Sequence, residues 1–314
     1  ADAKKSGDGG TVVLWSEEVT RVGGEISAKG GARGGNGGKV ETSGKKKLVV
    51  AESTVADTSA ANGKTGTWLL DPADIEIKDV PTSTEITFDT GTSAFEPDPG
   101  AGASVLARDL LQEQLALTNV VVTTTNSGAD GAGNGDIKVT DDVTWTSGTS
   151  LSLIAARDIL IEASIDGGAG GLTLEAGRHI DDGVNGQISI GTLTANAGGS
   201  ITLDNPDHLI GTLGPITGTG VVINDSEGGL RIAGAIDGRT GNVSILTGGG
   251  TLDVDATVRG ADVRLATTDS GDIALDAAVT ATGTLALDAA GNVTQTVSFS
   301  AGTLKGTVAG SATL

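Results

Sequence analysis

Four aspartates near the middle of the chain carry the side chains best suited to bind a hard cation. They are Asp130, Asp136, Asp141 and Asp142. Carboxylate oxygens are the ligands that Ca²⁺ prefers, so converging loops could turn this group into a calcium site. Asp181 and Asp182 offer the same chemistry further on. The alternative is that these acids lie at solvated corners and favour solubility. Ca²⁺ is the only cofactor that the sequence suggests.

Residues 131–139 (GAGNGDIKV) resemble one copy of a Gly-rich nonapeptide that binds Ca²⁺ between successive repeats, with Gly133, Gly135 and Asp136 near the required positions. Such a site is built between neighbouring copies, and the sequence contains a single one. The metal site therefore stays a hypothesis.

Arginines and aspartates close in sequence raise the question of a polysaccharide-processing groove, which needs acids beside bases. The candidate pairs are Arg157 with Asp158, Arg231 with Asp237, and Asp262 with Arg264. Such clefts usually stack sugars on aromatic rings. The chain has no Tyr, and its three Trp residues, Trp15, Trp68 and Trp145, are scattered. With no serine nucleophile elbow and no phosphate-binding loop, we expect no enzyme activity.

The two histidines, His179 and His208, lie apart and near predicted turns. Cysteine is absent, so the chain has no thiolate ligand, and no His-x-x-x-His pair is present. We expect neither a zinc site nor a disulfide.

The charge balance argues against two classes of partner. Forty acids and twenty bases give a formal net charge of −20, which opposes binding to nucleic acid or to anionic lipid. No stretch approaches the roughly 18 apolar residues that span a bilayer. We expect neither nucleic-acid binding nor membrane insertion.

Apolar residues recur about every 21 positions in the last third of the chain, in three interleaved ladders. The first is Ile201, Val221, Val243, Val263, Leu285 and Leu304. The second is Leu209, Leu230, Leu252, Ile273, Val293 and Leu314. The third is Ile216, Ile236, Val258, Val279 and Phe299. Three short β segments in each repeat predict an all-β fold, a right-handed, three-sided parallel β-helix with about 20–22 residues in each coil.

The pattern divides the chain into three parts. Residues 1–77 are predicted to form N-terminal coils, and residues 126–314 the regular coils. Between them, residues 78–125 contain prolines and a helical stripe, Leu106, Leu110, Leu111 and Leu115. We predict an excursion with a short helix over 104–117, capped by Ser104, that covers one face.

Four stretches carry a family resemblance: DGGTVVLW (8–15), GGEISAKGG (23–31), GGKVETSGKKKL (37–48) and GTWLLDPADIEI (66–77). They resemble the large secreted adhesins of the filamentous haemagglutinin type, closest to the high-molecular-weight adhesins of two-partner secretion. Their turn-forming residues are interpreted as structural, with Gly44 and the Asp71-Pro72 pair at corners.

The resemblance implies a parallel β-helix exported through an outer-membrane two-partner secretion transporter and displayed on the surface, or in the extracellular matrix, of a Gram-negative bacterium. Its members attach cells to one another, to host glycans or receptors, or to biofilm polysaccharide. No secretion or anchoring region is recognised, and Leu314 ends the chain on a ladder position, so we expect an internal section. The alternative is a structural stalk segment that binds nothing itself.

Overall fold

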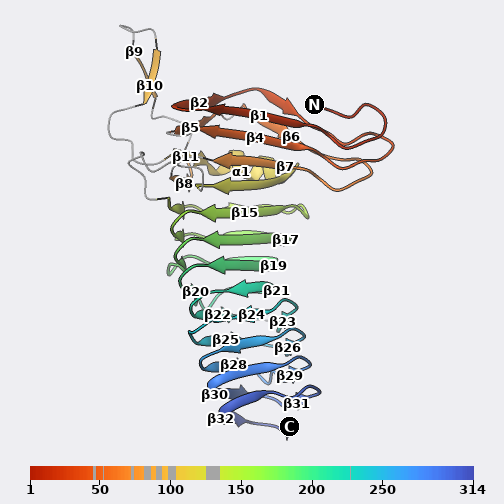
Figure 1. Ribbon diagram of the computed structural model, residues 1–314, viewed down its shortest axis with the longest axis vertical. Helices are drawn as coiled ribbons and strands as arrows, with labels where there is room; N and C mark the ends of the chain where they lie inside the picture. The colour runs from red at the N-terminus through yellow and green to blue at the C-terminus, as the bar shows by residue number, and fades with distance from the viewer. Residues whose placement is uncertain are drawn as a thin grey trace. The chain divides into compact units, whose positions relative to one another are not determined.

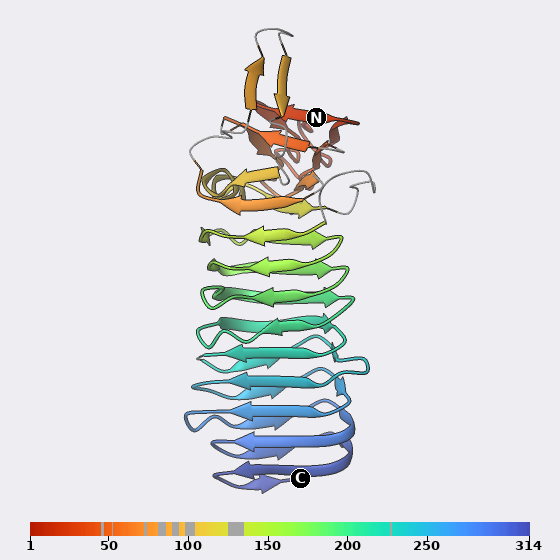
Figure 2. The same cartoon turned by 90° about the vertical axis from the view of Figure 1, so that its left-hand side faces the viewer.

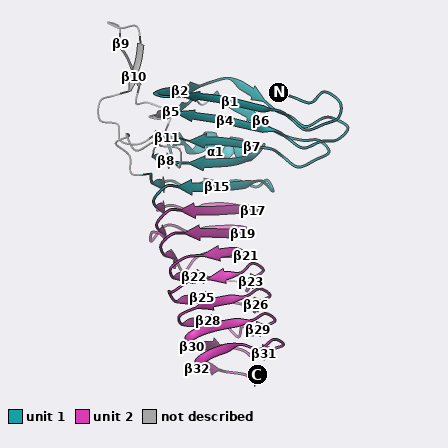
Figure 3. Cartoon of the chain, in the orientation of Figure 1, with its two compact units in different colours: residues 1–157 teal, residues 158–314 magenta. Residues whose placement is uncertain are grey.

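A computed structural model describes most of the chain. The described residues are 1–44, 47–51, 53–71, 74–80, 86–89, 94–97, 104–124, 135–226 and 228–314. They form two compact units, unit 1 (Ala1–Arg157) and unit 2 (Asp158–Leu314), coloured separately in Figure 3. Each unit is a β-solenoid of parallel strands (Figure 1), as predicted. Asp130 and residues 131–134 of the nonapeptide lie outside the described residues.

In unit 2 the coils follow one another with a regular register (Figure 2). One ladder joins β16 (Ile159–Ile161), β18 (Ile180–Asp182), β20 (Ile201–Leu203), β22 (Val221–Asp225), β25 (Val243–Thr247), β28 (Val263–Thr267), β30 (Val279–Ala289) and β32 (Ser300–Val308). Its strands alternate buried apolar residues with more exposed ones, because successive side chains of a strand point to opposite faces.

The other faces of unit 2 begin with three long strands, β17 (Ile165–Ala176), β19 (Ile188–Ala197) and β21 (Leu209–Thr217). From β21 the pairing divides into two ladders. One joins β23 (Leu230–Ile232), β26 (Leu252–Val254), β29 (Ile273–Leu275), β31 (Val293–Gln295) and β33 (Ala312–Thr313). The other joins β24 (Ile236–Asp237) and β27 (Val258–Gly260) to the first half of β30.

The first predicted ladder is confirmed at every position by the strand register. The second is wrong at both ends. Leu209 lies opposite Ser189 and is 41% exposed, while Ala312 rather than Leu314 lies opposite Val293. The third is confirmed from Ile216 to Val279. Phe299 immediately precedes β32 and is half-buried.

Unit 1 has longer coils. Its main ladder joins β1 (Thr11–Ser16), β4 (Lys39–Gly44), β7 (Thr67–Asp71), β12 (Asn119–Thr123) and β15 (Ser150–Ala155). Thr11 lies opposite Lys39 and Lys39 opposite Thr67, so each of these coils has 28 residues. The period of about 21 therefore describes unit 2 but not the first coils of unit 1.

Shorter strands complete unit 1. They are β2 (Val19–Val22) with β5 (Lys47–Val50), β3 (Glu25–Ser27) with β6 (Val55–Asp57), β8 (Ile75–Lys78) with β11 (Ser104–Ala107) and β13 (Ile137–Val139), and β14 (Val143–Thr144). An antiparallel pair, β9 (Ile86–Asp89) and β10 (Ala94–Pro97), lies within the predicted excursion. So do β11 and β12, which are nevertheless paired with coil strands.

The predicted helix exists but is shorter than expected. Helix α1 spans Arg108–Leu115, and Ser104 begins β11 instead of capping the helix. Ala107 is the N-cap residue and forms no side-chain cap. The prediction failed because the backbone of 104–107 pairs with β8, and these ladder bonds outweigh the local preference of serine for a cap.

Helix α1 is joined to neighbouring strands by two glutamine side chains. Gln114 is buried; its Oε1 accepts the N–H of Ala56 at 2.9 Å, and its Nε2 donates to the carbonyl of Thr54 at 3.2 Å. Gln112 Oε1 accepts the N–H of Thr144 at 2.8 Å. A side-chain amide carries the same donor and acceptor groups as a peptide bond. The two glutamines thus satisfy backbone groups of β6, of β14 and of Thr54, which precedes β6.

The ETSG motif forms the end of β4. Thr42 is fully buried and accepts a hydrogen bond from Trp68 Nε1 at 3.1 Å, one coil further on. Gly44 is the last residue of β4. Asp71 ends β7, whereas Pro72 lies outside the described residues. Thr42 thus joins two coils, and the predicted corner that follows Gly44 falls on residues 45 and 46, which lie outside the described residues.

Candidate functional site

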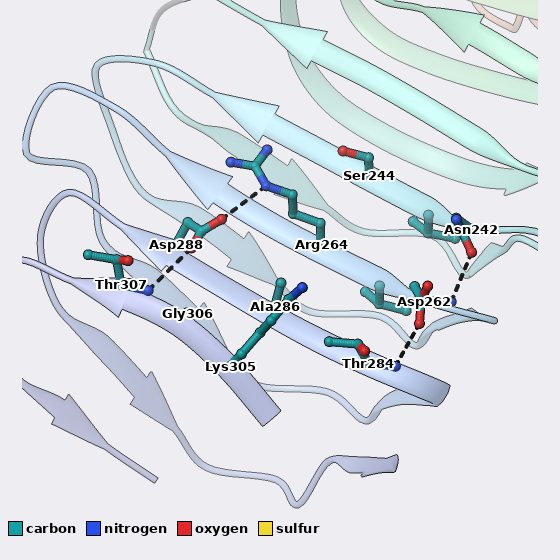
Figure 4. A pocket seen from close by; sticks show the side chains of 12 residues that line it. Asn242, Ser244, Asp262, Arg264, Thr284, Ala286, Asp288, Lys305, Gly306 and Thr307 are labelled. Carbon is teal, nitrogen blue, oxygen red and sulfur yellow. Dashed lines mark hydrogen bonds and ion pairs between the residues drawn. The ribbon is translucent and has the colours of Figure 1, made fainter. Parts of the chain in front are cut away.

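An open groove of about 520 Å³ runs across the outer face of four neighbouring strands of unit 2, β25, β28, β30 and β32 (Figure 4). Its lining residues are Asn242, Val243, Ser244, Asp262, Val263, Arg264, Thr284, Ala286, Asp288, Lys305, Gly306 and Thr307. Most of the side chains are polar, and they alternate with the buried apolar ladder of the same strands. The ladder therefore fixes which residues line the groove.

Side chains line up across the strands because the register is parallel and unbroken. Ser244, Arg264, Ala286 and Lys305 lie opposite one another in turn. We call these four residues the central row. Neighbouring strands are about 4.8 Å apart, so the row presents one side chain at each such step on a rigid support.

One margin of the groove is a chain of side-chain to backbone hydrogen bonds. Asn242 Oδ1 accepts the N–H of Asp262 at 3.1 Å, and Asp262 Oδ1 accepts the N–H of Thr284 at 2.7 Å. Figure 4 draws both bonds at the same end of the strands. These bonds hold the side chains of Asn242 and Asp262 in place.

The other margin is an ion pair that crosses from one coil to the next. Arg264 Nε donates to Asp288 Oδ2 at 3.0 Å, and Asp288 Oδ1 accepts the N–H of Thr307 at 3.2 Å. Both side chains of the pair are partly exposed, at 46% and 34%. Such a pair adds little stability but holds the guanidinium toward Asp288, as Figure 4 shows.

Gly306 fixes the backbone beside Lys305. Its φ is +152°, and a Cβ there would lie 1.8 Å from the carbonyl oxygen of Leu287. No side chain larger than hydrogen fits without moving β32 away from β30.

The groove therefore offers hydroxyl, amide, carboxylate and cationic groups on one exposed sheet face. This set can donate to and accept from the hydroxyl groups of a sugar, and its two cations can neutralise an anion. It lacks the aromatic platform of many sugar sites. Trp68 and Trp145 are buried in unit 1, and Trp15 of β1 is 53% exposed.

No protein-family model matches the chain, and no curated protein matches its sequence. Within the described residues, no helix has both the length and the apolar character needed to cross a bilayer. The site is therefore interpreted from its own geometry.

The three Arg–Asp pairs were candidates for sharing one face, and Asp262 and Arg264 do both line the groove. The salt bridges, however, join arginines to aspartates about one coil away. The observed pairs are Arg157 with Asp136, Arg178 with Asp158, Arg231 with Asp255, Arg259 with Asp237, and Arg264 with Asp288. Residues one coil apart lie side by side on neighbouring parallel strands, so their side chains meet across the register. A spacing of 20–24 positions was the signal that could have found these partners.

The calcium candidates that are described have other contacts. Asp136 accepts hydrogen bonds from Arg157, and Asp141 Oδ2 accepts the N–H of Asp79 at 3.0 Å. Asp142 is exposed beside the start of β14. The side chain of Asp182 is buried, whereas Asp181 faces outward. In the described part of the chain, no three His, Asp or Glu side chains are grouped as metal ligands.

The histidines have separate structural contacts in unit 2. His179 Nδ1 lies 2.9 Å from Ser200 Oγ. His208 is fully buried, and its Nδ1 accepts the N–H of Ile188 at 2.8 Å, so its proton is on Nε2. Nε2 lies 2.9 Å from Asp182 Oδ2 but is poorly aligned for a hydrogen bond, so the contact is mainly electrostatic.

A second buried carboxylate, Asp225, lies near His208. Asp225 Oδ1 accepts the N–H of Ile210 at 2.8 Å, and Oδ2 accepts the hydroxyl of Thr247 at 2.6 Å. Burial raises the pKa of Asp225 above its usual value, against the opposing effects of these two bonds and of His208. Because His208 and Asp182 are closed to solvent, the cluster is suited to holding coils together and not to catalysis.

Proposed function

We propose that this chain is a segment of a secreted bacterial surface adhesin that attaches cells to extracellular polysaccharide or to host glycans. The observation that supports this proposal most is the groove over β25, β28, β30 and β32, where polar and charged side chains face outward on a rigid sheet. The resemblance of the motifs in residues 8–77 to filamentous haemagglutinin-type adhesins supports it from the sequence.

On this proposal the work of the chain is mechanical and adhesive, with no catalytic step. A shallow groove lined by polar groups binds a single sugar unit weakly, and a surface that carries many copies gains avidity by multivalency. The protein would reach the cell surface or matrix through an outer-membrane two-partner secretion transporter. Ca²⁺ enters the proposal only through Asp136, Asp141 and Asp142.

A glycan and matrix-polysaccharide array tests the proposal with the full 314-residue chain, in Ca²⁺ and in chelator. Ala286→Leu fills the centre of the groove and is expected to abolish saturable binding. Ala274→Leu is the matched control, since Ala274 lies outside the groove, between Asp253 and Thr294. Equal binding by both variants would contradict the assignment to the groove, and loss in chelator would point to the aspartates.

A second candidate function is a structural stalk. The ladder from Ile159 to Leu304 is unbroken, which suits a segment that only carries load. Binding to no glycan on the array would favour the stalk over the adhesive segment.

A further inference from the structure

The central row places two cations on either side of a small residue. Arg264, Ala286 and Lys305 are consecutive in the parallel register. Two strand spacings separate the backbones of Arg264 and Lys305 by roughly 10 Å. The small side chain of Ala286 leaves open the space between the side chains of Arg264 and Lys305. Figure 4 shows the Lys305 side chain extending toward Ala286.

We propose that Arg264 and Lys305 bind the carboxylate of an acidic sugar unit, so that the ligand of the groove is a uronate-containing polysaccharide. This inference rests on the proposed glycan binding and names the class of glycan.

Arg264 and Lys305 both carry N–H donors that can bind a ligand. Asp288 engages Nε of Arg264, and among the described residues no other group binds its guanidinium, which leaves the two terminal nitrogens for a ligand. Lys305 is exposed and has no ion-pair partner in the described part of the chain. An unpaired lysine beside an arginine in a protein of net charge −20 is a local site of attraction for an anion.

The acids of the groove lie at its margins and are already engaged. Asp262 accepts the N–H of Thr284, and Asp288 accepts Arg264 and the N–H of Thr307. Together they balance the two cations, so a densely charged polymer would meet repulsion at both margins. A sugar with one carboxylate and several hydroxyls fits better, since carboxylate and hydroxyl oxygens at the margins accept from or donate to sugar hydroxyls.

Polygalacturonate, its fully methyl-esterified form and dextran sulfate provide the test, with binding to the full chain measured by calorimetry at low and physiological salt. We expect polygalacturonate to bind, the ester to bind at least about tenfold more weakly, and salt to weaken the acid form. Lys305→Gln and Arg264→Gln should each reduce the affinity for polygalacturonate about tenfold, and Lys305→Arg should retain it.

Arg231→Gln is the matched control, because Arg231 also pairs with an aspartate 24 positions on but lies outside the groove. Its affinity should equal that of the unchanged chain. Equal binding of the acid and the ester, unaffected by Lys305→Gln, would overturn the carboxylate assignment and leave glycan binding intact. Tighter binding of dextran sulfate would also overturn it. Binding of none of the three would overturn the inference, and failure on the array as well would overturn the proposed function.

Discussion

Unit 1 and unit 2 join their coils with the same hydrogen-bonding device at two different coil lengths. In unit 1, Asp8 accepts the N–H of Asn36, and Asn36 accepts the N–H of Lys64, each 28 positions on. In unit 2, Asn292 accepts the N–H of Ser311, 19 positions on. The short Asp and Asn side chains cap the next coil in both places. The number of positions between the two bonded residues therefore gives the coil length, because the bond joins equivalent positions of successive coils.

The two units differ more in how they handle irregularity. Unit 2 absorbs irregularity within its strands, which shift register at bulges in the β17–β19, β19–β21 and β30–β32 pairs. Unit 1 contains helix α1, whose Gln114 side chain bonds to the backbone of Thr54 and Ala56. A solenoid thus tolerates a helix where polar side chains replace the hydrogen bonds of a strand.

The largest expected effect is loss of a ladder residue in unit 2. Leu265 is fully buried between Ile245 and Leu287, so Leu265→Ala should lower the free energy of unfolding by about 2–5 kcal/mol. Urea denaturation measures the loss. Hydrogen exchange should quicken most in β25, β28 and β30, because each coil contacts mainly its neighbours. A uniform change across unit 2 would contradict this local picture.

The second largest loss of stability is expected from removing the contacts of Gln114. Gln114→Leu leaves the buried N–H of Ala56 and carbonyl of Thr54 without their side-chain partner, and should cost about 1–3 kcal/mol. Faster exchange of the Ala56 amide reports the loss directly. Glu113→Gln, on the exposed side of α1, is the control and should leave that amide protected. Unchanged exchange in Gln114→Leu would show that packing alone holds the helix.

The shared Asn device allows a matched pair of variants. Asn36→Ala in unit 1 and Asn292→Ala in unit 2 each remove an acceptor from one backbone N–H at an exposed corner, and Asn292→Ala also removes a donor to the exposed Asp272 carboxylate. Both should lose about 0.5–1 kcal/mol in the denaturation assay. Similar losses would support one device with two spacings, whereas an effect in only one unit would separate them.

The smallest expected effect concerns a surface ion pair. The hydrogen bond from Arg259 is the main reason that the pKa of Asp237 lies below its usual value. A lowered carboxyl pKa stabilises the fold above the usual value of 3.8, and this contribution disappears as the pH falls through the lowered pKa. Arg259→Gln should therefore raise the pKa of Asp237 and reduce the acid dependence of stability. An NMR titration of the Asp237 carboxyl measures the shift, and an unchanged pKa would refute the assigned cause.

The sequence alone was sufficient for the fold class and for the interior of unit 2. Residues such as Val221, Val243 and Val263 recur at coil spacing. Apolar side chains at this spacing must face inward to form the thin core, so the spacing predicts which of them are buried. The prediction failed at Leu209 and Leu314, which the strand register places off the ladder, and at Ser104, where strand pairing prevailed over a local preference.

Only the tertiary structure decided the partners on the outer surface. Outward residues carry no burial constraint, so a shift of one or two positions in coil length changes which side chains meet. Arg264 therefore pairs with Asp288 and not with its near neighbour Asp262, and the groove around Ala286 was not predicted. Because buried positions require apolar residues, the interior can be predicted from composition and spacing. The contacts between surface side chains depend instead on the register in which the coils stack.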